Sequence, residues 1–189
     1  MCSTVAEREA ALAAAADPLP GAQPHEARRP LRIPGAVDGR PLLEALVTLH
    51  PHRGRAYWSD ELAAGRLRYR GTAMVDEGRP LRAGMELEHL QPETVEPWVD
   101  ADLRVLYEDP WVLALDKSAP LPVHPCGRYC RHTVTALVAR AWPDVQLRPV
   151  HRLDAATTGV LLLAKSREVA RHLGESFERR EVDKVYLAR

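Results

Sequence analysis

The sequence is poor in cysteine, in net charge and in long apolar runs, and each shortage excludes a class of protein. Three cysteines in 189 residues are too few for a disulfide framework and suit a reducing cytosol. Acidic and basic residues number 26 each, so any affinity for nucleic acid must come from local patches. No apolar run could span a membrane, and the alanine-rich start lacks the basic region of a secretory signal. We therefore expect a cytoplasmic protein with no membrane partner.

The most informative stretch is His-Arg-Leu-Asp-Ala-Ala-Thr-Thr-Gly, residues 151–159, which an apolar run over residues 160–164 follows. A run this short, bounded by glycine and lysine, indicates a strand buried on both faces rather than a helix. Asp154 then lies in a loop at the end of that strand, where a sheet can hold a carboxylate in place. Taken alone, Arg152 and Asp154 are more typical of an ion pair or a loop cap than of a catalytic site.

The longer string resembles the active-site signature of the RluA-type pseudouridine synthases, H-R-L-D-x-x-T-S-G-L-L-L-x-A-K. Thr158 replaces the serine and keeps its hydroxyl group, and Val160 replaces the first leucine of the aliphatic run. Residues 107–125 resemble the family's stretch that ends in V-H-P, and residues 184–188 match its K-x-Y-x-A strand. The three motifs occur in family order, and the resemblance covers residues 103–189.

The resemblance implies an enzyme that isomerises uridine to pseudouridine in structured ribosomal or transfer RNA, with Asp154 as the catalytic residue. The reaction breaks the N-glycosidic bond, turns the base and rejoins it through carbon. No redox change or group transfer occurs, so no cofactor is needed. An ionised aspartate can act as a nucleophile or as a base, and the sequence leaves both possibilities open.

The same resemblance implies the substrate contacts. Tyr186 matches the aromatic residue that stacks on the extruded uracil, although a tyrosine packed in the core is the alternative. Arg152 would support the target loop, and Thr157 belongs to the same substrate site. The expected partner is structured RNA rather than DNA, and the expected state is a monomer.

One family element is missing from residues 1–189. Members of the family carry an R-x-H-Q-I-R stretch after the K-x-Y strand, and its first arginine pairs with the catalytic carboxylate. No such stretch occurs here. The sequence therefore predicts that residues 99–189 are the N-terminal part of an incomplete, truncated catalytic domain. A non-enzymatic RNA-binding remnant of a synthase is the alternative function.

Residues 31–92 predict a small α/β RNA-binding module, similar to one shared with a small-subunit ribosomal protein. Leucines at helical spacing follow Pro41, and Ser59 can cap a second helix that ends at Gly65. Residues 66–71 alternate as in a strand, which would place three arginines on one outward face that could contact phosphates. These arginines are Arg66, Arg68 and Arg70. A merely solvated strand face is the alternative.

Residues 1–30 combine an alanine-rich stretch without an amphipathic stripe and a segment rich in proline and arginine, and they predict a mobile tail. Beyond residue 99 we expect a hairpin over residues 103–115, a helix from Thr133, a helix capped by Ser166 and a strand from Val185. Strands and helices alternate without a regular βαβ repeat, so the predicted class is α+β with a mixed, mostly antiparallel sheet.

A second constellation competes for a chemical role. Two histidines and two cysteines lie within nine residues, and zinc accepts such ligands. They are His124, Cys126, Cys130 and His132. The C-x₃-C spacing is less usual than C-x₂-C, and the V-H-P motif already accounts for His124. Free thiols and no metal are therefore expected.

Overall fold

The computed structural model describes residues 4–188, which form two compact units. One unit consists of residues 24–94, and the other combines residues 4–23 with residues 95–188. Each contains one four-stranded sheet in which every strand pair is antiparallel, so the predicted α+β class is confirmed. None of the helices in residues 4–188 has the length and apolar character needed to cross a membrane.

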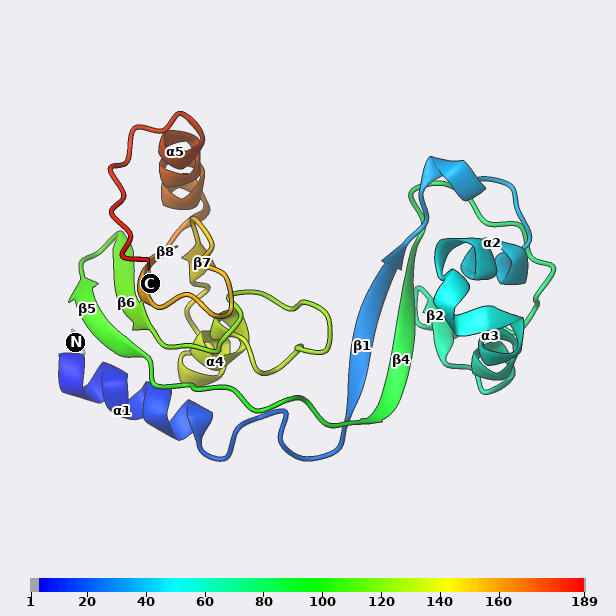
Figure 1. The fold of residues 1–189 in the computed structure, drawn as a ribbon, viewed down its shortest axis with the longest axis horizontal. Coiled ribbons are helices and arrows are strands. Elements are labelled where there is room, and N and C mark those ends of the chain that lie inside the picture. The colour runs from blue at the N-terminus through cyan, green and yellow to red at the C-terminus, as the bar shows by residue number, and fades with distance from the viewer. Residues whose placement is uncertain (1–3, 189) are drawn as a thin grey trace. The chain divides into compact units, whose positions relative to one another are not determined.

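The first unit is a small sheet with two helices packed on it (Figure 1). Its elements are β1 (His25–Arg32), η1 (Gly35–Val37), α2 (Leu42–Leu49), η2 (Pro51–Arg53), α3 (Gly54–Ala63), β2 (Leu67–Tyr69), β3 (Thr72–Ala73) and β4 (Glu86–Thr94). The strand order is β1-β4-β2-β3. Leu46 of α2, Leu62 of α3 and Leu87 of β4 are fully buried in one core. The unit begins seven residues before the predicted module and ends two residues after it, because β1 and β4 pair along their lengths.

The second helix of this unit differs from its prediction. α3 begins at Gly54, directly after the single turn η2, so Ser59 lies inside the helix and does not cap it. Its hydroxyl donates instead to the Glu77 carboxylate. The predicted end is right, because Gly65 follows the helix with a φ of +66°, which a residue with a side chain rarely adopts.

The second unit packs helices against a sheet with the order β5-β6-β8-β7. Its elements are α1 (Val5–Ala16), β5 (Arg104–Glu108), β6 (Val112–Lys117), α4 (Val134–Ala141), β7 (Arg148–Pro149), β8 (Gly159–Ala164) and α5 (Arg167–Glu178). The predicted hairpin is confirmed as β5 and β6. Thr133 and Ser166 cap α4 and α5 as predicted, since each side chain accepts a hydrogen bond from the backbone three residues later.

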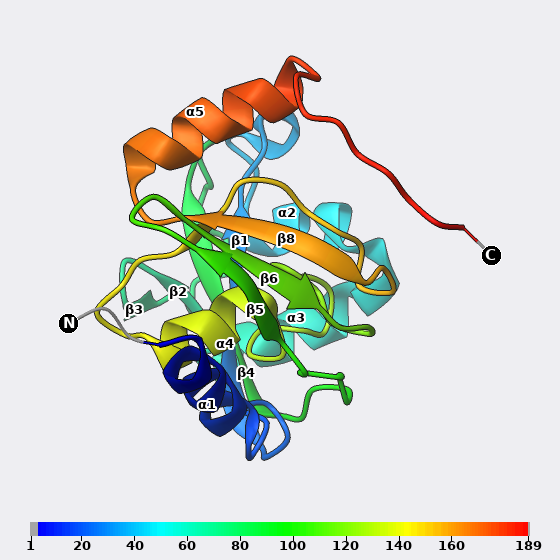
Figure 2. The same cartoon turned by 90° about the vertical axis from the view of Figure 1, so that its left-hand side faces the viewer.

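The strand that follows the motif of residues 151–159 is central in the sheet but buried on one face only. Leu161 and Leu163 of β8 are fully buried in the core, whereas Val160 is 54% exposed. Figure 2 shows why: α1 and α4 lie together on one side of the sheet. The prediction of a strand buried on both faces is therefore wrong for the face that carries Val160.

Within the predicted mobile tail over residues 1–30, the structure has α1 and most of β1, and residues 1–3 lie outside the described residues. Thr4 and Glu7 form a capping box at the start of α1, and Leu12 and Ala15 are buried against the core. Arg8 pairs with Glu108 of β5 at 2.9 Å. Alanines on the contact face give little amphipathic signal, which is why the sequence did not reveal the packing.

The predicted strand from Val185 does not form. Residues 183–188 follow α5 as an extended segment without ladder partners, and Val185 and Leu187 are exposed. A strand is stable only where a neighbouring strand accepts and donates its backbone hydrogen bonds.

Candidate active site

Asp154 lies in a tight turn between β7 and β8. The Thr157 amide donates to the Asp154 carbonyl oxygen at 3.0 Å and closes the turn. The preceding Leu153 is buried in the core, while the Asp154 side chain is 84% exposed. Arg152 is similarly exposed, and its Nη2 lies 4.0 Å from Asp154 Oδ1. The backbone is thus anchored on both sides of a carboxylate that is open to a reactant.

A fully buried lysine anchors the backbone of this turn by hydrogen bonds. Lys117 Nζ, at the end of β6, donates to the carbonyl oxygens of Ser118 at 2.8 Å, Leu121 at 2.7 Å and Ala155 at 3.4 Å. The Leu121 amide also donates to the Ala155 carbonyl oxygen at 2.9 Å. Burial lowers the pKa of Lys117. Sequence reasoning missed this residue, although a lone lysine at the end of an apolar run is a recognisable signal.

His151 fixes the other side of the motif. Its Nε2 accepts a hydrogen bond from the Leu162 amide of β8 at 3.1 Å, and its ring stacks on Phe177 of α5 with centroids 4.6 Å apart. Burial lowers the pKa of His151. The accepted hydrogen bond and the lowered pKa agree, because only the neutral imidazole has a ring nitrogen that can accept. His151 therefore serves to tie the motif to β8 and α5.

A small cavity of about 140 Å³ adjoins Asp154. Its walls are the segment Pro122–Cys126 on one side and the segment Arg152–Ala155 on the other. Burial, with Arg152 nearby, lowers the pKa of His124. The structure therefore brings the V-H-P segment and the Asp154 turn together.

The alternative zinc site is not assembled. His132 is buried, and its Nδ1 lies 2.7 Å from the Pro97 carbonyl oxygen, whereas Cys126 is exposed. Within residues 4–188, no three His, Cys, Asp or Glu side chains converge as metal ligands. Cys2 lies outside the described residues.

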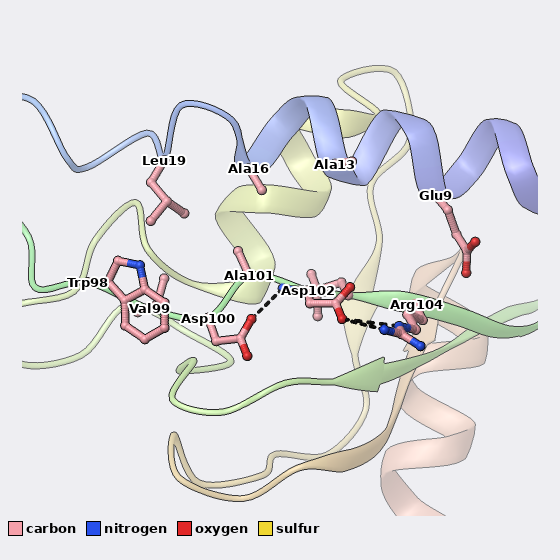
Figure 3. A pocket seen from close by; sticks show the side chains of 11 residues that line it. Glu9, Ala13, Ala16, Leu19, Trp98, Val99, Asp100, Ala101, Asp102 and Arg104 are labelled. Carbon is pink, nitrogen blue, oxygen red and sulfur yellow. Dashed lines mark hydrogen bonds and ion pairs between the residues drawn. The ribbon is translucent and has the colours of Figure 1, made fainter.

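Another cavity of this unit, about 700 Å³, lies along other elements and does not suit RNA (Figure 3). It runs along α1 and residues 98–104, and its carboxylates are those of Glu9, Asp100 and Asp102. Arg104 is the basic residue in its wall, and it pairs with Asp102 at 2.9 Å. A phosphate backbone would be repelled there, and none of the predicted site residues lines the cavity.

Comparison with known proteins identifies the part of the chain that holds the Asp154 turn. Residues 111–189 match the sequence model of the RNA pseudouridylate synthase family. These residues belong to that family. The match includes the buried Lys117, the V-H-P segment and the Asp154 turn, so the geometry above is that of a pseudouridine synthase motif.

Curated relatives carry the same family name. Pseudouridylate synthase RPUSD2 of Homo sapiens is 33% identical over 160 residues, which are 82% of this chain and 28% of that protein. An RNA pseudouridine synthase of Synechocystis, slr1592, is 36% identical over 135 residues, 71% of this chain and 46% of the relative. The tRNA pseudouridine(31) synthase of Saccharomyces cerevisiae is 29% identical over 192 residues, 88% and 46% of the two chains. The chain spans less than half the length of each.

The structure does not bring Tyr186 to the synthase motif. Tyr186 lies on the extended segment after α5, is 61% exposed and does not line the cavity beside Asp154. The alternative of a tyrosine packed in the core is not observed either. In the same segment, Lys184 Nζ lies 5.5 Å from the centroid of the Phe177 ring, so Lys184 meets the helix that stacks on His151.

The three predicted RNA-binding arginines do not share a strand face. β2 contains only Leu67–Tyr69, because the chain turns at Arg70, whose φ is +51°. Arg70 lies over the Tyr69 ring, with its Cζ 5.2 Å from the centroid. Arg68 alone sits within the strand, opposite Glu88 of β4. β2 therefore contains one of the three arginines rather than all three, whereas Leu67 and Tyr69 do point into the core as predicted.

Arg66 has a structural partner instead. Its Nη2 donates to Glu61 Oε1 at 2.8 Å, and Glu61 Oε2 lies 2.7 Å from Nε2 of the buried His89. Burial lowers the pKa of His89 even though Glu61 counteracts it. Arg66 thus compensates the charge of a carboxylate that connects α3 to β4.

Proposed function

We propose that this protein isomerises uridine to pseudouridine in structured RNA, with Asp154 as the catalytic residue. The observation that supports it most is the Asp154 turn. Its backbone is held by Lys117 and by a buried leucine, its carboxylate is exposed beside a cavity, and the sequence around it belongs to the pseudouridylate synthase family.

The geometry suits a reaction on an extruded base. A uridine within a stem is stacked, so the base must leave its stack before a carboxylate can reach the ribose or the ring. Asp154 projects from a turn, where such a nucleotide can approach it. Arg152, 4.0 Å away, can stabilise the ionised carboxylate or support the distorted RNA strand. Thr157 closes the turn through its backbone, and Tyr186 remains a candidate to stack on the uracil.

Transfer RNA is the substrate that we propose first. The yeast relative is named a tRNA pseudouridine(31) synthase, and a second yeast relative is named a mitochondrial tRNA pseudouridine(32) synthase. Ribosomal RNA is the second substrate to test. The exposed loops of either RNA offer bases that extrude at low cost.

The decisive experiment measures release of the hydrogen at uridine C5 from transfer RNA labelled at that position. We expect release by the unaltered protein and none above background by Asp154→Ala, because no other side chain can replace the carboxylate. Asp144→Ala, an exposed aspartate after α4, is the matched control and should retain full activity. Transfer RNA binding by Asp154→Ala should persist.

Two other outcomes are informative. Equal release by the unaltered protein and by Asp154→Ala would exclude Asp154 as the catalytic residue. Binding of RNA without release by either protein, with ribosomal RNA tested as well, would favour the non-enzymatic alternative.

A further inference from the structure

The cavity of about 700 Å³ along α1 has an apolar wall made of small side chains. Ala13 and Ala16 of α1 line one side of it and Ala101 lines the other, while Leu19 lies at one end (Figure 3). Methyl groups reach only a short way from the backbone, so space remains between α1 and residues 98–104. We call this space the α1 groove. It has room for an apolar side chain larger than alanine.

An exposed aromatic ring lies at the same end of the α1 groove as Leu19. Trp98 is 69% exposed and lines the groove (Figure 3). The next residue, Val99, is buried in the core, so the backbone that carries the ring is fixed. An indole ring at the rim of an apolar cavity offers a large surface to a partner. Its face also attracts cationic side chains.

The rest of the α1 groove is acidic. Among residues 4–188, three carboxylates and one guanidinium line it, an excess of two negative charges: Glu9, Asp100, Asp102 and Arg104. Glu9 accepts a hydrogen bond from the Val105 amide at 3.1 Å, and Asp100 accepts one from the Asp102 amide at 3.0 Å. A backbone amide carries no net charge. These two bonds therefore hold the carboxylates in place and leave their charges uncompensated.

The one guanidinium does not balance the groove. Arg104 pairs with Asp102, and both side chains are more than half exposed, so the pair is weak. Its hydrogen bond to Asp102 raises the pKa of Arg104, and the charges of Asp116 and Glu9 raise it further. A single cation thus lies in the field of three carboxylates, and this field attracts further positive charge.

The length of the α1 groove suits a short extended peptide. Glu9 and Ala16 are seven residues apart on α1, a rise of about 10 Å, and residues 98–104 span at most about 20 Å. An extended peptide advances about 3.3 Å per residue and points successive side chains to opposite sides. A peptide of roughly four residues therefore places apolar side chains against the alanines and basic ones beside the carboxylates.

We propose that the α1 groove is a docking site for an extended basic segment of a partner protein. An apolar side chain of that segment lies between the alanines and against Trp98, and its lysine or arginine side chains pair with Glu9 and Asp100. Charge complementarity favours this occupant and disfavours RNA. The inference goes beyond the proposed function, because the described residues that line the groove and those that line the cavity beside Asp154 are different.

The first test removes charge and keeps the hydrogen bonds. The probe is a fluorescein-labelled peptide of alternating leucine and lysine, and its affinity is measured by fluorescence anisotropy. The double variant Glu9→Gln and Asp100→Asn retains an acceptor oxygen for each amide. We expect roughly tenfold weaker binding near 0.1 M salt and a smaller dependence on salt. The control, Asp144→Asn with Glu178→Gln, removes two exposed charges outside the groove and should bind as the unaltered protein does.

The second test fills the groove without changing its charge. Ala13 and Ala14 are both exposed on α1, but only Ala13 lines the groove. Leucine suits a helix nearly as well as alanine. Ala13→Leu should therefore weaken peptide binding at least about fivefold by occupying the space, whereas Ala14→Leu should not. Equal affinities of these two variants and the unaltered protein would overturn the groove as the docking site.

Two competitors identify the class of ligand. A peptide with serine in place of leucine carries the same charge and should bind at least about fivefold more weakly, because it lacks the apolar contact. Spermine should displace the labelled peptide only at concentrations well above those of the unlabelled peptide. Equal binding of the serine peptide, or displacement by spermine at the same concentration, would overturn the peptide assignment. Asp154→Ala should bind the peptide normally, so failure of the proposed reaction would leave this result unchanged.

Discussion

The two units use charged side chains in opposite ways. In residues 24–94, one of the arginines that the sequence assigned to RNA binding has a structural role. Arg66 pairs with Glu61, and Glu61 contacts the buried His89. In the other unit the buried charges, Lys117 and Glu96, are satisfied by backbone groups. Arg152 and Asp154 of the motif, by contrast, are exposed. Exposure without a strong partner, rather than charge alone, distinguishes the candidate functional residues.

Replacing Lys117 by methionine should have the largest effect. Methionine fills a similar volume but leaves carbonyl oxygens of Ser118 and Leu121 without this donor in a buried site. We expect the second unit to lose about 2–4 kcal/mol of stability and C5 hydrogen release to fall with it. Urea unfolding measures the first quantity, and Lys184→Met, at an exposed position, is the control for stability. A change below about 0.5 kcal/mol would contradict the structural role of Lys117.

Removing the charge of Glu61 should have an intermediate effect, confined to residues 24–94. Glu61→Gln keeps a hydrogen bond but loses the charge that compensates Arg66, and we expect a loss of about 1–2 kcal/mol at pH 7. Glu44→Gln, which alters an exposed pair with Arg55, should cost far less. Thermal unfolding of the three proteins measures the difference.

The effect of Glu61 should also depend on pH. Burial raises the pKa of Glu61, but the hydrogen bonds from Arg66 and His89 outweigh burial and lower it below the ordinary value of 4.5. The carboxylate therefore stabilises the fold fully above pH 4.5, and this contribution is lost as the pH falls through the lower folded pKa. The gap in Tm between the unaltered protein and Glu61→Gln should narrow in that range. A constant gap from pH 7 to 3 would show that ionisation of Glu61 does not matter.

Charge reversal at Arg70 should have the smallest effect. It tests whether the unit of residues 24–94 contributes to RNA binding. Arg70 is exposed, so Arg70→Glu tests the predicted arginine face without breaking the Glu61 pair. We expect a loss of transfer RNA affinity of less than about threefold. A loss of about tenfold or more would reverse the comparison and place a main RNA contact in residues 24–94.

The sequence by itself determined the features that depend on neighbouring residues. Thr133 and Ser166 cap their helices because a hydroxyl reaches an amide three residues away, and Gly65 ends α3 because the required φ is positive. The contiguous motif around Asp154 was sufficient to indicate the family, since its residues lie in one turn and one strand.

Only the tertiary structure decided which charged side chains form hydrogen bonds or ion pairs inside the fold. Glu96 meets amides 34 to 36 residues further along the chain, and Lys117 reaches a carbonyl 38 residues away. α1 is held by Arg8 and Glu108, 100 residues apart. Periodicity reports which face of an element is apolar, but it carries no information about the distant backbone group that will meet a buried charge. For the same reason the alternation over residues 66–71 indicated an arginine face, while the packing of α3 assigned Arg66 to Glu61.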